Sequence, residues 1–410
     1  MRSDVPDGHV ESIYLSDVEP NPVGPLVHAA DLRSRVLLHV LLADALLVGD
    51  SQSLNNKYFR SLISPAEGDG GADAPQAHGS TVLADLAPLL QEGRIRVARR
   101  AGSTLLGIRD DHAAKQVNNV PDRAYVGRLD ALTAGRTVPY DVSAVGEAFR
   151  DGVLARIDAA LGEAAEPVRS ALAEARQWAA EQPRLLHIEL RGWIASYRAT
   201  AAGRHTGVVL ALQSLDDWAI DAYRTALPRV LGAGVARPRE AGDLPQGAHP
   251  RLLDQGALPG ALLDPFLLSR LPADFVLEAV AQPARTAVVQ QLARVRRGLR
   301  PDVPELGGAV EEFSRLLREA FERAFRPAGG PEWDHLQGTT RLMRFGLHED
   351  PLSGRLGASL DVGSVAADRY GRPLSFAVTG GAGVPDPAAA DRPEAAAAAA
   401  ADPYDRLVSA

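Results

Sequence analysis

Cysteine is absent from the 410-residue sequence. The chain therefore forms no disulfide, performs no thiolate catalysis and binds neither iron–sulfur clusters nor zinc through cysteine. Aromatic residues are sparse at 5%, although 46% of the residues are hydrophobic. We expect two or three domains, with cores built mainly from leucine, valine and alanine.

Lysine is almost absent as well. Lys57 and Lys115 are the only two, so 42 of the 44 basic residues are arginine. Neither lysine follows a glycine, which excludes a Walker-type phosphate-binding loop. Together with the many alanines and glycines, the arginine bias is typical of a GC-rich bacterial genome.

An excess of positive charge and a long apolar run are also missing. The formal net charge is −8, which argues against nucleic acid as a partner. The most apolar stretch, residues 36–48, is interrupted by His39 and Asp44 and is shorter than the roughly 20 residues of a membrane span. The polar N-terminus has no apolar secretion signal. We therefore expect a cytoplasmic protein without membrane association.

Helical periodicity dominates the rest of the sequence. Apolar residues recur on one face over 145–161, 168–179, 208–226 and 309–326, which predicts long amphipathic helices. Arg94–Val97 alternates between polar and apolar residues, and 356–362 and 374–378 are strand-like. The sequence predicts a mainly α, bundle-like fold with minor β elements in the N-terminal third and near the C-terminus.

The composition also suggests where the chain divides. Segments rich in Pro, Gly or Ala separate the helical regions. The predicted parts are a mixed helical domain with a few strands at 1–140, including a disordered loop at 64–80; a helical domain at 141–231; a Pro/Gly-rich connection at 232–261; a helical segment at 262–330 that packs on 141–231; a small β-hairpin region at 331–384; and a disordered Ala/Pro tail at 385–410.

The sharpest local pattern is Gly49-Asp50-Ser51-Gln52-Ser53, directly after an apolar stretch. It resembles the first block of the GDSL/SGNH hydrolases, and the resemblance implies that Ser51 is a nucleophile beside Asp50. The later Gly-x-Asn-Asp and Asp-x-x-His blocks of that family have no counterpart. Alternatively, Asp50 and Ser51 cap a short helix that holds Tyr58 and Phe59.

A second pattern lies in the predicted helix at 208–226. Asp216-Asp217-Trp218-Ala219-Ile220-Asp221 resembles the aspartate-rich motif of class I terpene synthases, which implies a magnesium–diphosphate site at Asp217 and Asp221. The second metal motif of that family is missing, since no asparagine follows Asn119. The alternative is that both aspartates form part of a solvated helix face, and we expect no bound metal there.

Two features concern single residue types. Arg94, Arg96, Arg99 and Arg100 cluster on and after the strand at 94–97, either as a patch for an anion or an acidic partner or as a solvated strand face. His39, set in an apolar helix near Asp44, is expected to be a core histidine with a satisfied hydrogen bond rather than a catalytic one.

These observations favour a non-enzymatic α-helical interaction or regulatory protein, one component of a multi-gene bacterial system, that binds a protein partner and no cofactor. The first alternative is a serine hydrolase that uses Ser51 in its GDSL-like segment. The second is a terpene-synthase-like enzyme that binds magnesium and diphosphate through Asp217 and Asp221.

Overall fold

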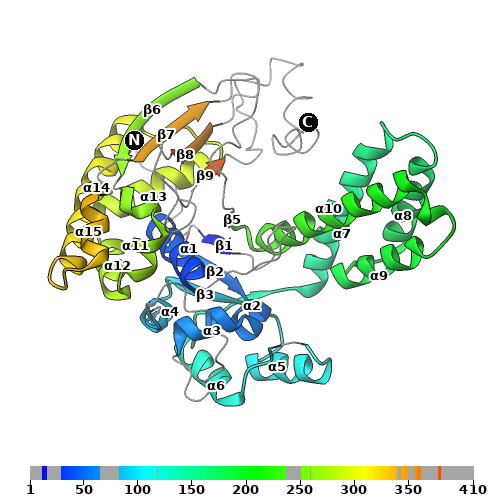
Figure 1. Ribbon diagram of the computed structural model, residues 1–410, viewed down its shortest axis with the longest axis horizontal. Helices are drawn as coiled ribbons and strands as arrows, with labels where there is room; N and C mark the ends of the chain where they lie inside the picture. The colour runs from blue at the N-terminus through cyan, green and yellow to red at the C-terminus, as the bar shows by residue number, and fades with distance from the viewer. Residues whose placement is uncertain are drawn as a thin grey trace.

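A computed structural model describes residues 12–15, 29–64, 83–117, 119–236, 251–258, 260–338, 343–349, 356–361 and 377–379 (Figure 1). It confirms a mainly α-helical protein with β elements in the N-terminal third and near the C-terminus. Of the predicted disordered segments, residues 65–80 and 385–410 lie outside the described residues. No helix in the described ranges combines the length and the hydropathy needed to cross a bilayer.

The strands of the N-terminal third form a parallel sheet. Its order is β4-β3-β2-β1-β5, and every neighbouring pair is parallel. The strands are β1 (Ser12–Leu15), β2 (Ala45–Gly49), β3 (Ile95–Arg100), β4 (Val138–Tyr140) and β5 (Gly234–Ala236). Because all five strands point the same way, the residues that follow them gather at one carboxyl edge.

Helices connect these strands and cover both faces of the sheet. Leu46 and Val48 of β2 face the main core, whereas Leu47 packs with Leu227 on the opposite face. This explains the unbroken apolar run of β2, since a strand buried on both faces has no polar side. The connecting helices are α1 (Ala29–Leu42), α2 (Asp50–Asn55), α3 (Lys57–Ile63), α4 (Ala87–Gln91), α5 (Leu105–Ala114) and α6 (Arg123–Leu132).

A helical arm is inserted between β4 and β5 and extends away from the sheet (Figure 1). It consists of α7 (Val142–Leu161), α8 (Val168–Glu181), α9 (His187–Arg198), the 3₁₀ helix η2 (Ala202–Arg204) and α10 (Thr206–Leu231). The predicted apolar faces pack on one another, and Phe149, Ile157 and Leu212 lie in a core that belongs to the arm alone. The C-terminal part of α10 reaches back to the sheet through Leu227.

The remaining elements follow the arm in sequence. They are β6 (Arg251–Leu258), the 3₁₀ helix η3 (Gly260–Leu263), α11 (Pro265–Arg270), α12 (Ala273–Val280), α13 (Pro283–Arg296), α14 (Val303–Phe325), α15 (Pro331–Gly338), β7 (Met343–Glu349), β8 (Leu356–Asp361) and β9 (Ala377–Thr379). The four strands form an antiparallel sheet in the order β6-β7-β8-β9. The segment at 232–261, predicted as a connection, thus contributes β5 to one sheet and β6 to the other.

The structure corrects the predicted packing of 262–330. Its helices do not share the core of the arm; Phe313 and Leu317 lie in the main core together with α1. The reason is visible in α1, which is buried on almost every side and packs against the sheet and against α11–α13. Arg285 strengthens this packing, since its buried guanidinium donates to the carbonyls of Val40, Leu41 and Ala43, where α1 ends without further helical partners.

Candidate functional site

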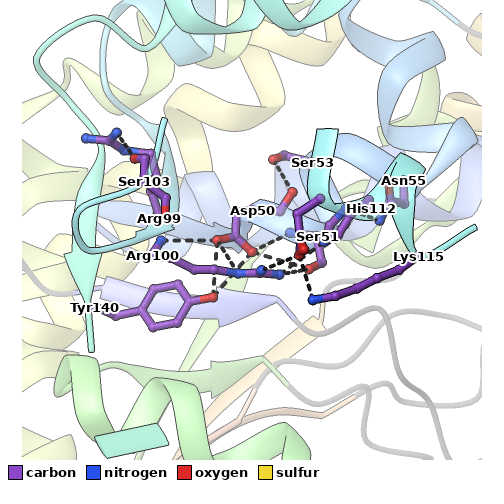
Figure 2. A network of polar contacts seen from close by, with 11 residues as sticks. Asp50, Ser51, Ser53, Asn55, Arg99, Arg100, Ser103, His112, Lys115 and Tyr140 are labelled. Carbon is purple, nitrogen blue, oxygen red and sulfur yellow. Dashed lines mark hydrogen bonds and ion pairs between the residues drawn. The ribbon is translucent and has the colours of Figure 1, made fainter. Parts of the chain in front are cut away.

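Polar side chains from three neighbouring strands meet at the carboxyl edge of the parallel sheet (Figure 2). Asp50 follows β2, Arg100 is the last residue of β3, and Tyr140 is the last residue of β4. In open parallel α/β sheets, ligands bind outside the carboxyl ends of the strands. This cluster is therefore the candidate functional site.

Asp50 is the centre of the cluster. It is 1% exposed, and a carboxylate buried to that extent is tolerated only when donors surround it. Oδ1 accepts the backbone N–H of Ser51 at 2.7 Å, and Oδ2 accepts the backbone N–H of Arg100 at 3.1 Å. The Tyr140 hydroxyl donates to the same carboxylate at 3.2 Å, and Nε of Arg100 lies 3.4 Å from Oδ2. Asp50 is thus a saturated acceptor that orients its neighbours.

Arg100 is held by Asp50 through Nε, which leaves the outer nitrogens of its guanidinium for other partners. Nη2 donates to Oγ of Ser51 at 3.3 Å and to Nε2 of His112 at 3.1 Å. Nη1 lies 3.7 Å from the Asp111 carboxylate. Burial lowers the pKa of Arg100, but Asp50, Tyr140 and Asp111 outweigh it and the net pKa is raised. The side chain is 26% exposed, so a fully charged guanidinium reaches solvent at this edge.

His112 lies on α5 and is 5% exposed. Arginine can only donate, so Nε2 of His112 carries the lone pair and Nδ1 carries the proton. Nδ2 of Asn55 lies 2.9 Å from Nδ1 of His112, which would set two donors against each other. The amide oxygen and nitrogen of Asn55 are therefore exchanged in our assignment, so that Oδ1 accepts the Nδ1–H proton. This orientation also gives a partner to Oδ1 of Asn55, an atom otherwise buried without one. Burial first and the charge of Arg100 second lower the pKa of His112, so the imidazole is neutral at pH 7.

The structure brings together only some of the residues that the sequence singled out. Asp50, Ser51 and Arg100 are in contact. Arg99 is turned away from them and donates to the Ser103 carbonyl. The alternative that Asp50 and Ser51 cap the helix containing Tyr58 is wrong: the Asn56 side chain accepts the N–H groups of Tyr58 and Phe59.

The four arginines predicted as one patch lie at opposite ends of β3. Arg94 and Arg96 are at its start, where Nε of Arg96 donates to the Gly93 carbonyl at 3.1 Å, while Arg99 and Arg100 end the strand. The sequence cluster is therefore divided between the start and the end of the strand. Whether either end binds an anion stays a prediction.

Asn55, His112 and Tyr140 were missed by reasoning from the sequence. Tyr140 could have been found once β4 was placed beside β3, because both strands end at the same edge. His112 had no such signal, since it is brought to Arg100 by the turn at the start of α5 rather than by any spacing typical of a motif.

Asp217 and Asp221 lie on α10 in the arm, away from this cluster. Asp217 is exposed, whereas Asp221 lies 3.4 Å from Arg156 of α7. The adjacent Asp216 lies 3.4 Å from Arg191 of α9. Within the described ranges, three or more His, Asp or Glu side chains nowhere form a group that could hold a metal ion. The magnesium hypothesis for Asp217 and Asp221 stays a prediction.

Comparison with protein-family models, with curated proteins and with solved structures gives no match for this chain. The carboxyl-edge cluster therefore has to be interpreted from its own geometry: a buried carboxylate, an oriented guanidinium that reaches solvent, and a neutral histidine with one defined tautomer.

Proposed function

We propose that this chain is a ligand-responsive regulatory protein that binds a small anion, such as a phosphate or carboxylate group, at the carboxyl edge of its parallel sheet. The observation that carries the proposal is the position of Arg100. Asp50 holds Nε of the guanidinium, Nη2 contacts Ser51 and His112, and Nη1 lies near Asp111, while the side chain as a whole stays 26% exposed.

The charge of this site is local. Arginine presents a planar set of donors that matches the oxygens of phosphate and carboxylate groups. Since the chain as a whole carries −8, its overall field does not attract anions, and binding must come from the oriented groups at the sheet edge. Ser51 adds a hydroxyl and His112 a ring nitrogen beside the same guanidinium.

We further propose that the helical arm, α7–α10, is the part of the protein that contacts a protein partner. It has a core of its own and presents large apolar side chains to solvent, with Ile188 72% and Leu210 60% exposed. Single apolar side chains at the surface are common, and we assign these two to the contact with the partner. We place this regulatory role in the cytoplasm of a GC-rich bacterium, as one component of a multi-gene system.

The test of anion binding uses the full chain and inorganic phosphate. Titration calorimetry should show saturable binding, and phosphate should raise the melting temperature because it binds the folded state. Arg100→Gln should abolish both effects, because it removes the charge. Arg99→Gln is the matched control: it removes the neighbouring arginine, whose guanidinium is turned to Ser103, and should bind like the parent. Equal responses in the two variants, or no binding by the parent, would refute the proposal.

The second candidate function is that of a serine hydrolase acting through Ser51. One observation favours it: Oγ of Ser51 and Nε2 of His112 both lie within hydrogen-bond distance of one atom, Nη2 of Arg100. Proton transfer needs a nucleophile and a base close to each other, and both side chains here contact the same guanidinium nitrogen. A fluorophosphonate probe should then label the protein, and Ser51→Ala should abolish labelling while Ser53→Ala retains it. An unlabelled parent protein removes this candidate.

A further inference from the structure

The environment of His112 gives each nitrogen of its ring a separate role. With the Asn55 amide oriented as assigned above, its oxygen accepts the Nδ1–H group of His112, whether the imidazole is neutral or protonated. Nε2 is the atom that can gain a proton, and it points at Nη2 of Arg100. Any change in the charge of His112 therefore occurs at the atom that faces the proposed anion site.

Several charged groups face this imidazole. From the edge of the sheet come Arg100 and the Asp50 carboxylate. Asp111 comes from α5, and Lys115 directly follows that helix. From α2 come the neutral side chains of Ser51 and Asn55. The two carboxylates favour a proton on His112, whereas Arg100 and Lys115 oppose it. Arg100 contacts His112 directly, so in the free protein the lone pair of Nε2 accepts the Nη2–H group of Arg100.

We propose that an anion bound at Arg100 is taken up together with one proton, which His112 accepts at Nε2. This inference rests on the proposed anion binding and adds its regulation. An anion oxygen placed against Nη2 replaces His112 as the acceptor of that N–H group. Nε2 then carries a proton from solvent and donates to the same oxygen, so two cationic donors share one anion. No covalent bond to the ligand forms or breaks.

The sign of the effect follows from linkage. The bound negative charge favours the protonated imidazole and raises the pKa of His112 from the lowered value of the free protein. Because proton and anion each strengthen the binding of the other, affinity rises as pH falls. The site thus responds to two signals at once, the concentration of the anion and the pH.

Sulfate is the probe of choice because its own charge is constant between pH 8 and pH 5.5. Titration calorimetry of the full chain should show affinity rising at least about fivefold over that range, the lower end of ordinary coupling. At a pH within the transition, the measured heat should also depend on the ionisation heat of the buffer, with proton uptake approaching one per sulfate. His112→Gln should bind with an affinity that no longer depends on pH and with no proton uptake.

Two further variants keep the test decisive if His112→Gln folds poorly. Asn55→Asp places a carboxylate against Nδ1, which favours the imidazolium and should move the rise in affinity to higher pH. His187→Gln is the control: it changes a half-buried histidine in the arm, whose pKa burial also lowers, and should retain the pH dependence of the parent. Circular dichroism and melting temperature establish folding for each variant.

The outcomes separate this inference from the proposal on which it rests. Sulfate binding that requires Arg100 but has the same affinity and no proton uptake at every pH overturns the coupling and leaves anion binding intact. A pH dependence that persists in folded His112→Gln, or that is lost in His187→Gln, also overturns it. No sulfate binding at any pH, in a parent protein that binds no phosphate either, overturns both.

Discussion

Tyr140 donates its phenolic hydroxyl to the carboxylate of Asp50, at 3.3 Å from Oδ1 and 3.2 Å from Oδ2. The two residues are 90 positions apart and end or follow strands that are not adjacent in the sheet. Burial raises the pKa of Tyr140, and the negative charge of Asp50 raises it further, so the hydroxyl stays protonated and remains a donor. This bond links the edge strand to the centre of the candidate site.

Tyr140→Phe should therefore destabilise the protein by about 1.5 kcal/mol, since it removes a hydrogen bond to a charged group while keeping the ring. Chemical denaturation measures this change. Anion binding should weaken as well, because Asp50 then orients Arg100 less strictly. A variant as stable as the parent would show that Asp50 gains sufficient stabilisation from its other donors.

We expect the protein to lose stability in mild acid because of the buried side chain of His39. Burial, reinforced by the charge of Arg35, lowers the pKa of this buried side chain to about 3, whereas an unfolded histidine titrates near 6.5. Between these values the unfolded chain binds the additional proton, so stability is complete above pH 6.5 and falls as the pH drops towards 3. From pH 7 to pH 5, His39 should account for a loss of about 2 kcal/mol.

The measurement is the free energy of unfolding at several pH values for the parent and for His39→Leu. Leucine does not titrate, so the variant should lose less stability between pH 7 and pH 5, whatever its stability at pH 7. Parallel curves would show that other groups cause the acid sensitivity.

Two glycines of the arm form a matched pair. A Cβ at Gly203 would lie 2.0 Å from the carbonyl oxygen of Tyr197, because η2 folds directly against the end of α9. Gly203→Ala should therefore destabilise the arm by about 2–3 kcal/mol. At Gly192, within α9, a Cβ meets nothing within 4 Å, so Gly192→Ala should stabilise by about 0.5–1 kcal/mol. Tryptophan fluorescence during denaturation reports on the arm, which holds three of the four tryptophans.

Asp217 tests the magnesium hypothesis. We expect no magnesium-dependent shift in melting temperature, with or without inorganic diphosphate, because Asp217 is exposed and Asp221 pairs with Arg156. Asp217→Asn should be neutral or stabilising by a few tenths of a kcal/mol, since it removes one like-charge contact at i,i+4 spacing. A clear rise in melting temperature with both ligands, lost in the variant, would instead support a diphosphate site.

Much of the helical structure could be predicted from the local periodicity of apolar residues. The recurring apolar positions of α7, α8, α10 and α14 identify these helices because an amphipathic helix must bury one face whatever lies opposite. Asp141 precedes α7 and caps it, since its side chain accepts the Ser143 N–H at 2.8 Å. The apolar run in the second half of α1 likewise indicates burial, but not the helices against which α1 packs.

The candidate site was predictable only in fragments. Asp50, Ser51 and Arg100 stood out by residue type. Nothing in their spacing, however, predicts that Asp50 contacts Arg100 rather than Arg96. That pairing depends on β2 and β3 lying parallel and in register, with Gly49 opposite Ala98. Asn55, His112 and Tyr140 carry no signal before those strands are placed.

The sequence by itself determined the long amphipathic helices, the faces that they bury and the chemistries that the lack of cysteine excludes, because these follow from side chains and short-range periodicity. Only the tertiary structure decided the order of the strands, the packing of α11–α14 on α1, and the meeting of Asp50, Arg100, His112 and Tyr140. Contacts between residues far apart in the chain depend on which buried faces fit one another, and no local pattern encodes that choice.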